Sequence, residues 1–331
     1  TVVSKEHARV FGRVQVQNFD GRIEPVNTLA SELLRKISRK NSHAGMSPVQ
    51  VMLSMMLEPE KWEDEPIIKI SGKEAGNIIG VRGSYAAFTD FLDPDAPNGY
   101  KLSRYIEAAY DKSPGERTKF DKEIISIDER VNIFYKMIGG GFLAIFPVPE
   151  AEDNKWLSLP SAHTQRDRNL AVTATTLMQA YLSGLEKGVE TGNYNDAAAA
   201  LVKIKENQKK YGSEIYPSGL KTTLEIFYIN FNMFSKLARI YIVVGMIMLI
   251  VRFILLFSPT RALNRISLIS FWVALLLFVS HTTGLGIRWY ISGHAPWSNG
   301  YETLLYISWS ACLAGLIFAK STGALLVWYG T

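Results

Sequence analysis

Residues 240–257 read IYIVVGMIMLIVRFILLF, an apolar run long enough to cross a bilayer hydrocarbon core of about 30 Å as a helix. Arg252 is the one charged residue in this run, and it lies close enough to the end for its guanidinium to reach the interface. Further apolar runs occupy 266–287 and 303–319, and another begins near Gly323. The sequence therefore predicts three membrane helices and part of a fourth.

The rest of the chain has the composition of a soluble domain. Of 331 residues, 36 are Lys or Arg and 31 are Asp or Glu, and both signs are spread along the sequence. No basic block has the form of a nucleic-acid arm, so we expect no nucleic-acid partner. The one cysteine, Cys312, excludes a disulfide framework or a cysteine zinc site within the chain, and we predict no metal site. We expect a soluble domain over 1–237 and a membrane region over 238–331.

The soluble part is predicted to be mainly helical with a minor β component. The pair Asp20-Gly21 separates two short runs, and in the first of them Val14 and Val16 share a face opposite Gln15, which indicates a β-hairpin. Another strand is expected at 67–70. The fold class is thus mainly α: a helical soluble domain with a small hairpin component, followed by transmembrane helices.

Several helix starts carry capping signals. Thr28 is predicted to cap a helix that presents Leu29, Leu33 and Ile37 on one face. Capping-box patterns begin at Ser47, Ser71 and Ser113. The helix from Ser47 should stop before Pro59, and the one from Ser113 should run to Gly139. Two more helices are predicted near 163–188 and 195–210.

The basic segment 35–40 has two readings. Cations suit the C-terminal end of a helix electrostatically. The same charges could form a patch for anionic lipid or a partner, and the sequence leaves both open. The glycine-rich segment 76–83 matches neither a Walker A motif nor a dinucleotide fingerprint, so turns and helix packing are expected there.

Cations flanking the apolar runs predict an orientation. Four lie on one side of the predicted bilayer and three on the other; the first group is Arg252, Arg261, Arg265 and Lys320, and the second is Lys236, Arg239 and Arg288. Because cytoplasmic ends carry the excess of Lys and Arg, the soluble domain is expected outside the cytoplasm.

Two of the five histidines have an unusual context. His281 lies inside an apolar run, where an imidazole costs free energy unless it has a partner. It could ligate a haem iron or bond to a neighbouring helix. His294 lies in a short aromatic connection between two membrane helices. The aromatic side chains Trp289, Trp297 and Tyr301 belong at a membrane interface, and would also suit the rim of a flat ligand such as a porphyrin. For His7, His43 and His163 we expect surface or structural roles.

The run 288–309, RWYISGHAPWSNGYETLLYISW, resembles the early region of CcsA/ResC-type cytochrome c biogenesis proteins. That family joins early membrane helices with an Arg-Trp, Ser-Gly-His, Pro-x-Ser-Asn-x-Tyr-Glu-Ser, Ser-Trp series. Here Thr303 replaces the usual serine, and Trp297 stands where leucine is common. The upstream run 20–30, DGRIEPVNTLA, is similar to the soluble region of fused CcsB–CcsA (ResB/ResC) proteins.

The resemblance implies a role in System II cytochrome c maturation. It implies haem as the bound group, and as partners apocytochrome c, the lipid bilayer and the remaining CcsA/CcsB helices of a longer parent. It also implies the bacterial cytoplasmic (inner) membrane, with 1–237 on the periplasmic side. The parent would be a haem-attachment synthase.

The family's tryptophan-rich haem-handling segment is absent from this sequence and is expected beyond Thr331. We therefore assign no catalytic residue and expect the chain, a fragment cut at both ends, to be inactive alone. A possible haem path is formed by five side chains: His281, His294, Trp289, Trp297 and Tyr301. Three others, Pro296, Asn299 and Glu302, are expected to fix the loop. Alternative readings are a membrane-anchored extracytoplasmic binding or sensor module, and a transporter fragment.

Overall fold

The computed structural model describes residues 2–165 and 168–317, and it divides into two compact units, Thr1–Pro217 and Ser218–Thr331. Both units are mainly helical, and the strands form three two-stranded antiparallel hairpins in the first unit. The predicted fold class is confirmed.

The first unit contains ten helices within its described residues: α1 (Lys5–Phe11), α2 (Val26–Ser38), α3 (Pro48–Leu57), α4 (Pro59–Glu63), α5 (Lys73–Ile79), α6 (Ser103–Tyr110), α7 (Lys119–Ile138), α8 (Leu159–His163), α9 (Arg168–Thr191) and α10 (Asn195–Tyr211). The hairpins pair β1 (Gln15–Gln17) with β2 (Ile23–Pro25), β3 (Ile68–Lys69) with β4 (Tyr85–Ala86), and β5 (Phe146–Pro147) with β6 (Trp156–Leu157). Two short 3-10 turns are η1 (Thr89–Phe91) and η2 (Pro97–Gly99).

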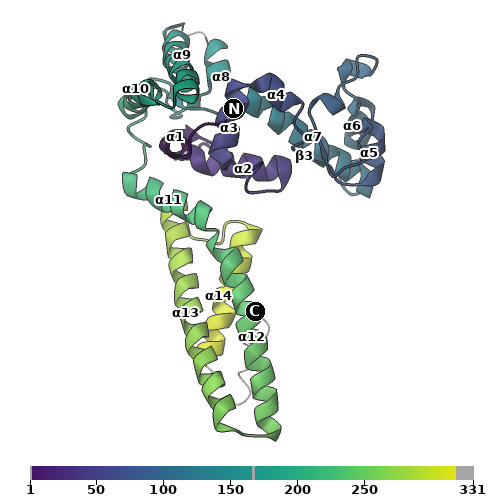
Figure 1. Cartoon of the computed structure of the whole chain (residues 1–331), viewed down its shortest axis with the longest axis vertical. Coiled ribbons are helices and arrows are strands. Elements are labelled where there is room, and N and C mark those ends of the chain that lie inside the picture. Colours follow the sequence, from purple (N-terminus) through teal and green to yellow (C-terminus); the bar gives the residue numbers. More distant parts are fainter. Residues whose placement is uncertain (1, 166–167, 318–331) are drawn as a thin grey trace. The chain divides into compact units, whose positions relative to one another are not determined.

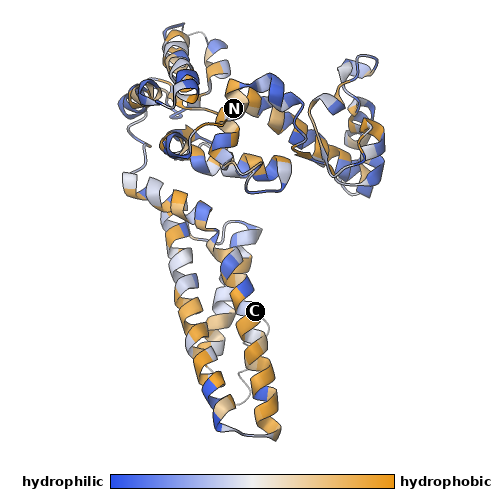
Figure 2. Cartoon of the chain, viewed as in Figure 1, coloured by the Kyte–Doolittle hydropathy of each residue, from blue (hydrophilic) through white to orange (hydrophobic). Residues whose placement is uncertain are grey.

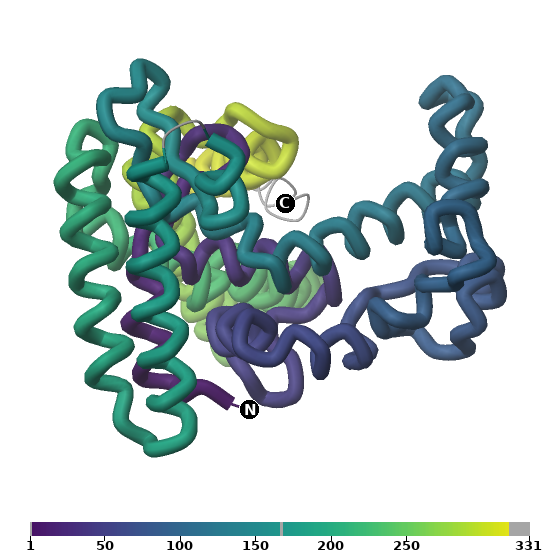
Figure 3. The backbone as a smooth tube through the Cα atoms, turned by 90° about the horizontal axis from the view of Figure 1, so that it is seen from above, coloured from purple at the N-terminus to yellow at the C-terminus, as the bar shows by residue number. Residues whose placement is uncertain are grey.

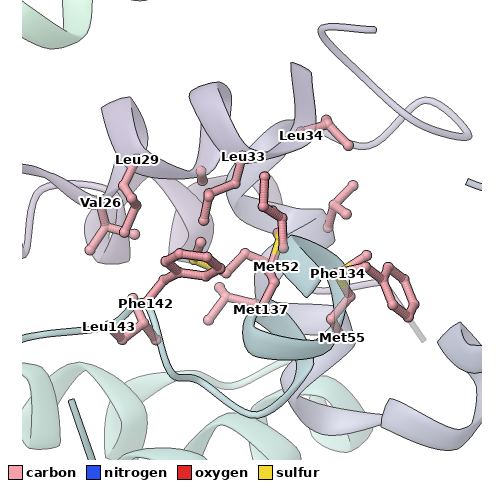
Figure 4. Packing of buried hydrophobic residues seen from close by; sticks show 14 of the residues in the cluster. Val26, Leu29, Leu33, Leu34, Met52, Met55, Phe134, Met137, Phe142 and Leu143 are labelled. Atoms are coloured by element: carbon pink, nitrogen blue, oxygen red, sulfur yellow. The ribbon is translucent and has the colours of Figure 1, made fainter. Parts of the chain in front are cut away.

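The core of this unit lies where α2, α3 and α7 meet. Leu33 of α2, Met52 of α3 and Met137 of α7 point toward one another there (Figure 4) and are each at most 3% exposed. A second packing element is the antiparallel pair α9 and α10, which lie side by side (Figure 3). A Cβ on Gly184 would lie 2.6 Å from the backbone nitrogen of Ala197, so this approach requires glycine.

Several local predictions are confirmed. The Asp20-Gly21 turn joins β1 and β2, and β3 lies within 67–70. Ser47 forms a complete capping box with Gln50 at the start of α3, which ends before Pro59. The helices predicted near 163–188 and 195–210 are α9 and α10.

Three predicted helix starts are wrong. Helix α2 begins at Val26, directly after β2, so Thr28 lies inside it and does not cap it; its predicted apolar face is nevertheless buried. Helix α5 starts after Gly72, whose φ of 86° breaks the box expected at Ser71. Ser113 does bond to the Glu116 carboxylate, but the helix begins only at Lys119.

The late start of α7 has a visible cause. A second capping box, formed by Thr118 and Asp121, lies five residues further on and opens the helix. Lys112 also donates to the Asp121 carboxylate at 2.8 Å. The bonds from Lys112 and Thr118 together lower the pKa of Asp121 to about 2. Gln15 is buried like Val14 and Val16, so both faces of this segment are covered.

The second unit consists of α11 (Gly219–Phe231), α12 (Met233–Phe257), α13 (Arg261–Ser292) and α14 (Gly300–Ile317) within the described residues. Helices α12 and α13, of 25 and 32 residues, are long and apolar enough to cross a membrane, with mean hydropathies of 2.8 and 2.0 over their most apolar windows. Figure 2 shows how much of their surface is apolar.

These helices differ from the core helices of a soluble protein, because most of their apolar side chains are exposed. The third predicted membrane helix appears as α14 up to Ile317. Its last residues and the helix predicted from Gly323 lie outside the described part of the chain. This unit begins at Ser218 because α11 packs against α13, and the boundary between a soluble and a membrane region at 237/238 stays a prediction.

Candidate functional site

His281 lies in the middle of α13 and is 4% exposed. Its ring meets Phe234 edge-on at a centroid distance of 5.4 Å, and the Tyr241 ring lies 6.1 Å away. Neither ring nitrogen has a hydrogen bond of good geometry, although the backbone of Leu305 in α14 is close enough to interact with the ring. An imidazole buried among apolar helices without bonded partners is costly, which is typical of a ligand-binding group.

A cavity of about 120 Å³ adjoins the His281 ring between α12, α13 and α14. Its polar lining consists of His281, Tyr241, Ser308 and Cys312, and the remaining walls are apolar. The Tyr241 hydroxyl faces the Cys312 thiol. The cavity therefore gathers nitrogen, oxygen and sulfur donors from three helices at one depth of the bundle.

His294 occupies a different place. It is exposed in the connection between α13 and α14, and its Nδ1 lies 3.1 Å from the carbonyl oxygen of Ala295. From His281 to the end of α13 at Ser292 the helix rises roughly 16 Å at 1.5 Å per residue. The two histidines therefore do not converge on one small site.

The aromatic residues of the predicted rim are all exposed: Trp289 by 57%, Trp297 by 59% and Tyr301 by 54%. Trp289 lies near the end of α13, Trp297 in the connection that follows, and Tyr301 at the start of α14. Trp297 meets Tyr306 edge-on at 5.5 Å, and Tyr306 stacks on Trp309 at 5.7 Å. The aromatic surface thus continues from the loop along α14, an arrangement that the sequence analysis did not predict.

A network built on Glu302 holds this loop. Its carboxylate is 1% exposed and accepts hydrogen bonds from Arg288 Nε at 2.8 Å and from the Ser298 N–H at 2.9 Å and hydroxyl at 2.7 Å. The Glu302 N–H donates to Asn299 Oδ1 at 3.0 Å. Pro296, also assigned to the loop, is buried. The loop roles of these residues stay predictions, with a geometry that suits them.

Arg288 and Tyr228 belong to the same network, and the sequence analysis gave neither a role in the site. Arg288 Nη1 donates to the Tyr228 hydroxyl at 3.3 Å, which ties α11 to α13. The guanidinium also lies 5.6 Å from the Tyr301 ring centroid, where a cation–π contact is favourable. The one available signal was Arg288 itself, an arginine at the end of an apolar run.

The histidines of the first unit have structural partners. His7 is buried, bonds to the Tyr181 hydroxyl at 3.1 Å, and burial lowers its pKa to about 4. His43 contacts the Glu65 carboxylate at 2.7 Å, and His163 bonds to Thr175 at 3.1 Å. Within residues 2–165 and 168–317, no group of three His, Cys, Asp or Glu side chains is placed to hold a metal ion.

A porphyrin does not fit the cavity as the described residues form it. Ligand pockets for drug-sized molecules begin at about 300 Å³, well above the volume beside His281. The His281 side chain is nevertheless chemically suitable, since an imidazole without a hydrogen-bond partner can ligate iron. The described residues thus supply one possible ligand and one wall, rather than a complete haem pocket.

The chain thus combines a mainly helical first unit with a second unit in which α12 and α13 are long and apolar enough to cross a membrane. The chain is 36% identical over 318 residues to Protein NrfI of Wolinella succinogenes, an alignment that covers 96% of this chain and 35% of NrfI. The chain spans about a third of that relative's length, and no model of a known protein family matches it.

Proposed function

We propose that this chain is part of a fused CcsB–CcsA protein of System II, which delivers haem to apocytochrome c and attaches it. The observation that carries the proposal is the homology to NrfI, which extends over 96% of the chain and so includes both units. The 288–309 run adds support, since its loop is built around buried, mutually bonded residues. Attachment itself belongs to the longer protein.

In this proposal His281 is the residue of the chain that contacts the haem path. Neither ring nitrogen of His281 has a hydrogen-bond partner, so one of them can bind iron. The exposed aromatic residues Trp289, Trp297 and Tyr301 form one side of the path, and His294 lies at its outer edge. When bound, haem supplies the vinyl groups that react with cysteine thiols of the apocytochrome. In this proposal the residues of this chain hold and orient the haem.

We infer the orientation from charge. Arg261 is the first residue of α13, directly after the turn from α12, and Arg265 follows one helical turn later. Under the positive-inside rule this end faces the cytoplasm of the bacterial inner membrane. The opposite end, with α11 and the 293–299 connection, then lies on the periplasmic side together with the first unit.

The test is the haem content of the purified full-length protein. His281→Ala should lower the haem absorbance per protein, whereas Ser280→Ala should not, because Ser280 is half-buried on the same helix and its hydroxyl bonds to the Leu276 carbonyl. Equal haem content in the two variants would remove His281 from the path. Wild-type protein without haem in a haem-sufficient host would count against the function itself.

A further inference from the structure

Two ammonium groups of the first unit lie over one tyrosine ring, and two arginine residues adjoin the lysines that carry them. The Lys40 ammonium lies 4.2 Å and the Lys69 ammonium 4.9 Å from the centroid of Tyr85. Arg39 ends α2 in the left-handed conformation, with φ 60°, beside Lys40. Arg130, on α7, donates to the backbone carbonyl of Lys69. The cluster therefore draws on α2, β3 and α7, which are distant in sequence.

Arg130 is the unusual member. It is 5% exposed, its Nε has no hydrogen-bond acceptor, and Nη1 and Nη2 bond to neutral oxygens of Lys69, Ser71 and Ser126. A buried guanidinium whose hydrogen bonds all go to neutral oxygens is energetically costly. Burial, and then the nearby Arg39, lower the pKa of Arg130, and Glu129 offsets part of this effect.

The cations of this cluster form no ion pair with a carboxylate in the described part of the chain. Among the ion pairs of residues 2–165 and 168–317, none involves Arg39, Lys40, Lys69 or Arg130. The α2 macrodipole accounts for cations at the C-terminal end of that helix. It does not account for Lys69 on β3 or for a buried guanidinium on α7, so the dipole explains part of the cluster.

We propose that Lys40 and Lys69 over the Tyr85 ring, with Arg39 next to Lys40 and the buried Arg130 bonded to the Lys69 backbone, form a binding site for a multiply charged anion bearing phosphate or carboxylate groups. The three outer cations contact the anion, and Arg130 adds a buried positive charge beside them. The Tyr85 hydroxyl donates a hydrogen bond to the Ser38 carbonyl at 3.1 Å, which fixes the position of the ring. This site is independent of the haem path.

The probe is inorganic tripolyphosphate, titrated calorimetrically into the full chain in an uncharged detergent at low salt. We expect saturable binding that weakens roughly tenfold or more in Lys40→Gln/Lys69→Gln, because two charge-assisted contacts are lost. The matched control is Lys210→Gln, which removes an ammonium 4.7 Å from the Tyr211 ring elsewhere on the unit. It should change Kd by less than about twofold.

Two outcomes would overturn the proposal: no saturable binding to the wild-type chain, or an equal loss in the Lys210 control. Arg130→Met should weaken binding by roughly threefold with an unchanged far-UV circular dichroism spectrum; if this variant misfolds, the double lysine variant decides alone. Native mass spectrometry of the chain released from phosphatidylglycerol nanodiscs shows whether the bound anion is a lipid headgroup or a soluble molecule. Fewer retained lipids in the double variant indicate a lipid headgroup, and equal retention beside lost tripolyphosphate binding indicates a soluble anion.

Discussion

Removing the Glu302 carboxylate should destabilise the membrane unit more than any other change in the 288–302 loop. Glu302→Ala deletes four contacts: two to Arg288, at 2.8 and 2.7 Å, and two to Ser298. Breaking a buried ion pair from one side costs about 3–5 kcal/mol. The Arg288 side chain is 25% exposed, so the lower value, about 3 kcal/mol, applies. Asn299→Ala, which removes one capping acceptor, should cost about 1 kcal/mol.

The assay is thermal unfolding of the full chain in detergent, followed by tryptophan fluorescence. A loss of about 3 kcal/mol corresponds to a Tm lowered by roughly 6 °C or more. The double variant Arg288→Met/Glu302→Leu should recover much of this loss, because it leaves no unpaired charge. The reasoning fails if Glu302→Ala lowers Tm no more than Asn299→Ala, or if the double variant is less stable than the single one.

Two further predictions concern the first unit. His7 has a pKa lowered to about 4 from 6.5, so its contribution is present above pH 6.5 and is lost as pH falls toward 4. His7→Phe should flatten the dependence of the unfolding free energy on pH over this interval, by up to about 3 kcal/mol. The unfolding free energy is measured by urea titration at each pH, and the same pH dependence in the variant and the wild type would contradict the assignment. Gly184→Ala should destabilise by about 1–3 kcal/mol, because its Cβ would meet the Ala197 backbone at 2.6 Å. Gly245→Ala, in open space on α12, is the control and should be neutral or stabilising; similar effects at both positions would refute the packing argument.

Much of the fold follows from local sequence signals. The apolar runs predict α12 and α13, Asp20-Gly21 predicts the first hairpin, and Ser47 predicts the start of α3. These signals act within one turn or one helix. They succeed because no neighbouring signal competes with them.

The failures arise where two local signals compete. Ser113 and Thr118 both carry capping patterns, and the structure uses both sets of bonds but starts the helix at the second. At Thr28, the strand β2 feeds directly into α2, so the helix begins before the capping residue. A single sequence does not rank such alternatives.

Tertiary contacts explain what the sequence could not predict about the site. Tyr228 and Arg288 are sixty residues apart and meet because α11 packs on α13. The composition of a helix indicates that His281 is unusual, but not that both its nitrogens lack bonded partners. Similarly, the basic 35–40 segment suggests a helix end, and only the fold brings Lys69 and Arg130 to it.

Cytochrome c maturation in a bacterial strain that lacks its own haem-attachment system tests the central claim most directly. The full-length protein and an apocytochrome with a Cys-x-x-Cys-His motif are expressed together, and covalent haem is stained after denaturing electrophoresis. The account predicts a haem-stained cytochrome that depends on the protein and decreases in His281→Ala at equal protein abundance. The same low staining with and without the wild-type protein would contradict it.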